Sequence, residues 1–145
     1  DMKSAFLLID LDNFKEINDT MGHVQGDLVL REVAEILRSS FRKTDIVGRL
    51  GGDEFIVLMR DIKSQENVRS SAEKLLGLLR RTYKREGREV SISGSIGIAM
   101  VPECGRKFKH LYDCADQALY SVKYAGKGGC CFAEKADSRQ KAEQE

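Results

Sequence analysis

Several features that define common protein classes are scarce or absent in this chain. It has no tryptophan and one proline, which excludes a proline-rich linker or ligand, and its four cysteines include no Cys-x-x-Cys pair. No apolar stretch approaches the about 18 residues that a membrane-spanning helix needs, so we expect no membrane segment here. Charge of neither sign dominates, because 24 Lys and Arg stand against 23 Asp and Glu, and this balance argues against nucleic acid as a partner. We interpret the cysteines as reduced thiols of a cytoplasmic protein.

The chain has the length and the apolar content of one folded domain. Its 145 residues are 41% hydrophobic, which is enough to bury a core. We place the domain at residues 1–133. Residues 134–145 contain no large apolar side chain, and we expect this polar tail to be disordered.

The spacing of apolar residues predicts alternating strands and helices. The continuous run Ala5–Ile9 is typical of a strand that is buried on both faces. Helical spacing predicts helices over 13–21, 27–41, 64–83 and 109–125. Further strands are expected over 46–47, 55–59, 90–100 (one strand or two) and 130–133. This order predicts an α/β (α+β) fold with a central, mostly antiparallel sheet flanked by helices, rather than regular βαβ alternation.

Carboxylates stand at the ends of predicted strands in two places. Asp10 and Asp12 follow the first strand, and Asp53 and Glu54 lie in a predicted hairpin. If these strands pair, the acids converge and repel one another unless a cation lies between them. Mg²⁺ suits such oxygen ligands. The alternative is that Asp10 caps a turn and that the hairpin tip is simply polar.

Two glycines precede the second pair of acids. Gly51 and Gly52 suit a tight hairpin, because glycine accepts positive φ angles. Without side chains, their backbone also allows a phosphate or a ribose to approach closely.

The segment Arg49–Phe55 resembles the signature of the GGDEF-domain diguanylate cyclases. Three further segments resemble that family in the same order, so the resemblance covers roughly residues 5–127. They are Asp10-x-Asp12-x-Phe14-Lys15-x-Ile17-Asn18-Asp19-x-x-Gly22-His23-x-x-Gly26-Asp27, Ser95-x-Gly97-Ile98-Ala99 and Ala115-Asp116-x-Ala118-Leu119-Tyr120-x-x-Lys123. The resemblance implies a palm-like nucleotide cyclase core.

The resemblance also implies a reaction, in which two GTP molecules condense into cyclic di-GMP and pyrophosphate. It implies that Asp10, Asp53 and Glu54 are catalytic and that they bind metal together with the carbonyl of Leu11. Two Mg²⁺ ions are implied, with Mn²⁺ as an alternative. Glu54 is either a metal ligand or the acceptor of the hydroxyl proton. Each domain of this family holds one GTP, so catalysis needs a homodimer.

Substrate contacts follow from the same resemblance. Asn18 and Asp27 match the family's guanine-reading pair, and a carboxylate accepts from the N1–H and N2–H donors that adenine lacks. The remaining implied substrate-binding residues are Asn13, Phe14, Gly51, Gly52, Lys123 and Lys127. Lys127 stands where the family usually has arginine, so it keeps the charge but loses the bidentate geometry. Ordinary helix-end positions are the alternative for Asp27 and the two lysines, and an exposed helix face is the alternative for Asn18.

Arg42-x-x-Asp45 resembles the family's inhibitory site, at which cyclic di-GMP binds away from the catalytic centre. A surface ion pair is the alternative for this common pattern. We also expect this chain to be the cytoplasmic part of a longer protein with a regulatory domain, which is either free or membrane-anchored, because the family's usual lead-in is absent. Two further functions stay open: a module that binds GTP or cyclic di-GMP and signals through a partner without catalysis, and another metal-dependent nucleotidyl transferase.

Overall fold

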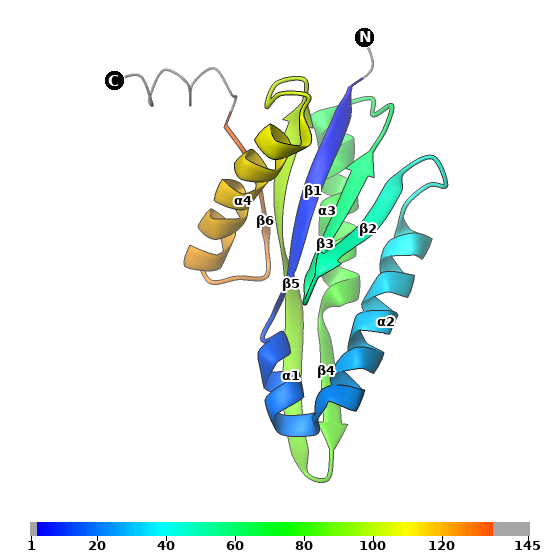
Figure 1. Ribbon diagram of the computed structural model, residues 1–145, viewed down its shortest axis with the longest axis vertical. Coiled ribbons are helices and arrows are strands. Elements are labelled where there is room, and N and C mark those ends of the chain that lie inside the picture. Colours follow the sequence, from blue (N-terminus) through cyan, green and yellow to red (C-terminus); the bar gives the residue numbers. More distant parts are fainter. Residues whose placement is uncertain (1–2, 135–145) are drawn as a thin grey trace.

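The computed structural model describes residues 3–134, which form one sheet with helices on both faces (Figure 1). The elements in chain order are β1 (Ser4–Asp12), α1 (Phe14–Met21), α2 (His23–Ser40), β2 (Ile46–Gly51), β3 (Glu54–Met59), α3 (Gln65–Leu79), β4 (Arg81–Arg85), β5 (Arg88–Val101), α4 (Phe108–Tyr124) and β6 (Cys130–Phe132). The strand order is β2-β3-β1-β5-β4, and β6 pairs with β5. All pairings are antiparallel except that of β5 with β6, so the expected mostly antiparallel sheet is confirmed.

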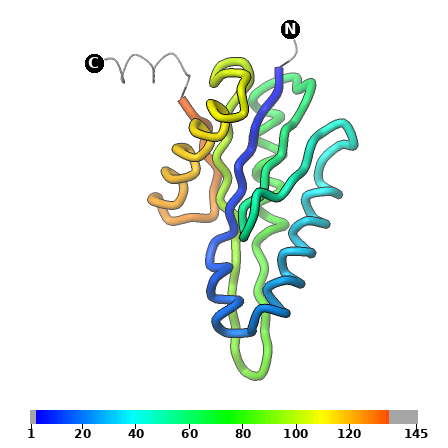
Figure 2. Tube along the Cα trace, in the orientation of Figure 1, coloured from blue at the N-terminus to red at the C-terminus, as the bar shows by residue number. Residues whose placement is uncertain are grey.

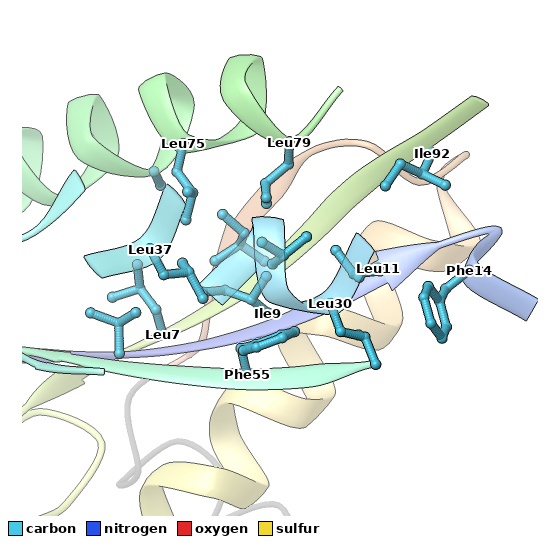
Figure 3. Close-up of a cluster of buried hydrophobic side chains, with 14 of the residues drawn as sticks. Leu7, Ile9, Leu11, Phe14, Leu30, Leu37, Phe55, Leu75, Leu79 and Ile92 are labelled. Carbon is cyan, nitrogen blue, oxygen red and sulfur yellow. The ribbon is translucent and has the colours of Figure 1, made fainter. Parts of the chain in front are cut away.

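β1 is the central strand, and its alternation divides the core into two. Leu7 and Ile9 face α2 and α3, while Phe6 and Leu8 face α4. All four are almost fully buried, which confirms a strand covered on both faces. Figure 3 shows the larger cluster, in which Leu7, Ile9 and Leu11 point toward leucines of α2 and α3. Because side chains alternate, Asp10 and Asp12 lie on the face covered by α4.

One predicted element was wrong at its end. The helix expected over 64–83 ends at Leu79, and residues 81–85 form β4 instead. Tyr83 continues the helical spacing, but it pairs with Val90 of β5 across a hairpin. Glu86 and Gly87 form the two-residue turn with φ angles of 50° and 77°. Such a turn matches the twist of the two strands, and this non-local pairing outweighs the local periodicity.

Three further expectations concern the cysteines, a membrane segment and the C-terminal tail. The four cysteines are free thiols. Within residues 3–134, no helix has both the length and the hydropathy that crossing a bilayer requires. The predicted disordered tail lies outside the described residues, apart from Glu134.

Candidate active site

The end of β1 and the glycine turn of the β2–β3 hairpin meet in space. Asp10 pairs with Glu54 in the sheet register, and the N–H of Leu11 donates to the carbonyl of Asp53 over 3.2 Å. Gly52 turns the chain with a φ of +53°, and Arg49 Nε donates to its carbonyl over 2.9 Å. The predicted convergence of the two acidic segments is therefore confirmed, because β1 and β3 are neighbours.

The charge of Asp10 is controlled by its surroundings. Burial raises its pKa, the nearby Lys123 ammonium lowers it, and the carboxylate of Asp53 raises it again, with a net upward shift. The carboxylates of Asp10 and Asp53 repel each other, and a cation between them would relieve this repulsion.

Lys123 reaches from α4 to both carboxylates of β1. Its Nζ lies 3.2 Å from Oδ2 of Asp10 and 2.6 Å from Oδ1 of Asp12. Burial would lower the pKa of Lys123, but the hydrogen bond to Asp12 and the charge of Asp10 outweigh it and raise the pKa. The lysine is therefore held in its charged form at the acidic edge, by which we mean Asp10 and Asp12 of β1 and Asp53 and Glu54 of the hairpin.

Glu54 is held by a residue that the sequence reasoning did not select. The hydroxyl of Tyr112, on α4, donates to Oε1 of Glu54 over 2.8 Å. This hydrogen bond and burial raise the pKa of Tyr112 to about 12. Glu54 lies on the same face as Asp10 because the two residues are cross-strand partners, so an α4 side chain can reach it.

A cavity of about 450 Å³ opens beside these acids. Its lining includes Leu11, Asn13, Phe14, Asp53, Lys123 and Lys127, which are all predicted site residues. The two lysines thus face a space bordered by Asp53, as a site for an anionic substrate with a bound cation requires.

The start of α1 borders the same cavity. Asn13 precedes the helix with a φ of 66° and offers it no side-chain cap. Backbone N–H groups at an uncapped helix start favour an anion. Asn13 and Phe14 both line the cavity.

Asn18 and Asp27 come from the two packed helices α1 and α2. Asn18 lies against the backbone of Gly26, because an added Cβ at Gly26 would stand 1.9 Å from Asn18 Oδ1. Asp27 follows directly and is exposed. The missing side chain at Gly26 is what lets the asparagine amide lie beside the first turn of α2.

The Arg42-x-x-Asp45 segment lies elsewhere, between α2 and β2 and well away from the hairpin turn (Figure 2). Asp45 has a side chain only 2% exposed, and it accepts from the N–H groups of Arg42 and Arg60, both over 3.0 Å. The Arg42 side chain is 57% exposed and reaches Asp45 over 3.3 Å and the carbonyl of Arg60. The pair is therefore a real contact, with the guanidinium accessible.

The donor atoms at the acidic edge suit Mg²⁺. Asp10 and Asp53 offer carboxylate oxygens, and the backbone carbonyl of Leu11 adds a third oxygen. Across residues 3–134, no three His, Cys, Asp or Glu side chains group closely enough to hold a metal ion. Mg²⁺ commonly uses one or two carboxylates and takes its other ligands from water and substrate phosphates. The residues present therefore fit an ion that is completed by the substrate.

Sequence reasoning missed the supporting residues of the site. Ser93 and Ser95 of β5 donate to Asp12, and Tyr112 donates to Glu54. The alternation Ser93-x-Ser95-x-Gly97 is a usable signal, because it marks one polar and small face of a strand.

The comparisons with known proteins show the family of the chain. Residues 1–129 match the family model described as diguanylate cyclase, GGDEF domain. The chain is 42% identical over 144 residues, 99% of its length, to the bifunctional diguanylate cyclase/cyclic di-GMP phosphodiesterase MucR of Pseudomonas aeruginosa. It spans only 21% of MucR, and 31% of the diguanylate cyclase TpbB of the same species, to which it is 40% identical over 93% of its length.

Solved structures of GGDEF domains have the same fold as this chain. The crystal structure of the GGDEF domain of TpbB is 39% identical with a TM-score of 0.83, covering 91% of this chain and 83% of that one. The GGDEF domain of DgcB from Caulobacter crescentus, in complex with c-di-GMP, is 27% identical with a TM-score of 0.81, covering 90% and 78%. The fold is therefore that of the GGDEF domains in these structures. The chain belongs to the GGDEF domain family of diguanylate cyclases.

Proposed function

We propose that this chain is an active diguanylate cyclase domain that condenses two GTP molecules into cyclic di-GMP and pyrophosphate. The observation that carries the proposal is the meeting of Asp10, Asp53 and Glu54. Asp53 also lines a cavity whose lining includes Lys15, Lys123 and Lys127. The names of TpbB and MucR support this activity, and MucR also carries a phosphodiesterase name.

In the proposed reaction, the 3′-hydroxyl oxygen of one GTP bonds to the α-phosphorus of the other. The bond from that phosphorus to the bridging oxygen breaks, and pyrophosphate leaves. Divalent cations, two Mg²⁺ or Mn²⁺, would lower the pKa of the hydroxyl and neutralise charge on the leaving group. Asp10, Asp53 and the Leu11 carbonyl would hold them.

The chain's other site residues position the substrate in this proposal. Lys123, Lys127 and the start of α1 hold the phosphates. Glu54, oriented by Tyr112, ligates a cation or accepts the hydroxyl proton. Gly51 and Gly52 leave room for the approaching ribose or phosphate. Two copies must face each other, because one cavity holds one GTP, so the active species is a homodimer.

The direct test is an assay of the 145-residue chain, fused to a dimerising coiled coil, with GTP and Mg²⁺. We expect cyclic di-GMP and pyrophosphate in a ratio of about 1:2 and no product with EDTA. GTP binding without product would favour the non-catalytic binding module. Product from ATP would favour another nucleotidyl transferase.

Guanine selection is expected to depend on Asp27. Asp27→Asn replaces an acceptor with an amide that also presents donors, so binding of a non-hydrolysable GTP analogue should fall by about 10²-fold, with no gain for the ATP analogue. Competition binding measures both. Glu35→Gln on the same helix is the control, and an unchanged preference for guanine in Asp27→Asn would contradict the assignment.

Product inhibition is expected to depend on Arg42. Arg42→Ala removes an exposed guanidinium that suits a phosphate or a guanine edge, so inhibition by micromolar cyclic di-GMP should weaken by about tenfold or more. The initial rate at rising product concentration measures it. Arg38→Ala, which removes an exposed arginine near the end of α2, should leave inhibition unchanged. Equal inhibition of Arg42→Ala and the wild type would rule out this site.

A further inference from the structure

We propose that Asp12 is the positioning residue of the phosphate site: it holds Lys123 and the turn that carries Lys127 in place, without touching substrate. This inference rests on the proposed function, because it assumes that the two lysines bind a triphosphate. Neither the sequence motifs nor the comparisons assign this role to Asp12.

The contacts of Asp12 join four parts of the fold. The residue is 1% exposed. Its Oδ1 accepts from Lys123 Nζ over 2.6 Å and from Ser95 Oγ over 2.8 Å. Its Oδ2 accepts from Ser93 Oγ over 2.6 Å and from the N–H of Gly128 over 3.1 Å. One carboxylate thus connects β1, β5, α4 and the turn after α4.

These contacts occupy both carboxylate oxygens of Asp12. Lys123, Ser93, Ser95 and the N–H of Gly128 all donate to them. A buried carboxylate with this many donors is rigid, because each lone pair has a fixed partner.

The turn that carries Lys127 is closed by backbone hydrogen bonds from Gly126 to Lys123 over 3.3 Å and from Lys127 to Val122 over 3.0 Å, and Asp12 adds a side-chain contact to it. Gly126, Lys127 and Gly128 have φ angles of 119°, 67° and 69°. A lysine in the left-handed region is locally unfavourable. The N–H of Gly128, one residue after Lys127, is bound by Asp12 and by Ser95 Oγ over 3.1 Å. This contact ties the turn to β1 and β5, while Lys127 lines the cavity.

Asp10 is not suited to this task. It contacts Lys123, but in the proposed function its oxygens are needed for cations, which compete with the lysine. The side chain of Asp12 is 1% exposed, whereas that of Asp10 is 27% exposed. Asp12 therefore keeps Lys123 beside the phosphates whether or not a cation is bound.

The test measures binding by the 145-residue chain. In Asp12→Asn, the affinity for a non-hydrolysable GTP analogue should fall by about 10- to 100-fold, both with Mg²⁺ and with EDTA, while guanosine affinity stays within about twofold. Guanosine reports on the base site without phosphates, so it separates loss of the phosphate site from general damage. Glu32→Gln is the matched control, since Glu32 also accepts from a hydroxyl and a cation, those of Tyr83 and Arg81, outside the cavity lining.

A double-mutant cycle tests whether Asp12 affects binding of the analogue through Lys123. If Asp12 acts through the lysines, Asp12→Asn should cost clearly less in the Lys123→Met background than in the wild type. Fully additive losses, or equal losses for the analogue and guanosine, would overturn the inference.

Two further outcomes are distinguishable. If Asp12→Asn does not fold, Ser95→Ala deletes a donor to both oxygens of Asp12, and the same selective loss is expected from it; no selective loss there overturns the inference. Analogue binding by the wild type with unchanged binding by Asp12→Asn also overturns it but leaves the proposed function standing. No binding of GTP or its analogue by the wild type would overturn the proposed function itself, and the inference with it.

Discussion

Replacing Asp53 with asparagine is expected to lower cyclic di-GMP formation by about 10²- to 10³-fold while the protein stays folded. The substitution keeps the shape of the side chain but removes the negative charge that faces Asp10. The backbone carbonyl of Asp53 still accepts from Leu11, so the hairpin remains attached to β1. Product formation under saturating GTP and Mg²⁺ measures the loss.

The same variant has a second readout in the pKa of Asp10. Burial raises that pKa and Lys123 lowers it, while the charge of Asp53 raises it further. The Asp10 pKa should therefore fall in Asp53→Asn, and carboxyl NMR titration measures this. Asp113→Asn, an exposed acid of α4, should change neither quantity. If Asp53→Asn turned over GTP at the wild-type rate, this result would contradict the catalytic role assigned to Asp53.

The second large effect is expected at Gly97, where β5 meets α4. A Cβ there would stand 2.0 Å from the carbonyl oxygen of Ala115 and 2.6 Å from the N of Leu119. Both atoms are helix backbone, so the whole of α4 must move. We expect Gly97→Ala to lower the free energy of unfolding by about 3 kcal/mol or more, measured by urea denaturation.

A matched glycine gives the opposite sign. Gly77 lies on α3 with nothing within 4 Å of an added Cβ, so Gly77→Ala should raise the free energy of unfolding by about 0.5–1 kcal/mol. A loss below about 1 kcal/mol in Gly97→Ala would show that α4 is not held closely against the sheet. The result bears on function because α4 also carries Tyr112 and Lys123.

Local patterns were sufficient for much of the fold. The run Ala5–Ile9 predicts a doubly buried strand, and the structure buries it between α4 on one face and α2 and α3 on the other. The glycine pair at 51–52 predicts a turn, and the chain turns at Gly52 and Asp53 directly after β2 ends at Gly51. The end of α3 could not be read in this way, because Tyr83 fits a helix by spacing and joins a strand only through its partner Val90.

The amino-acid order by itself determined which chemical groups the site contains: the acids at the end of β1, the acids after the glycine pair and the lysines near the end of α4. Only the tertiary structure decided which partner each of these groups contacts. The pairing of β1 with both β3 and β5 puts Glu54 and Ser95 on either side of Asp10, and puts Ser93 beside Asp12. Packing of α4 on that face then brings Tyr112 to Glu54 and Lys123 to Asp12. These contacts join residues 58 and 111 positions apart, and no local periodicity encodes a distance between segments that the sheet brings together.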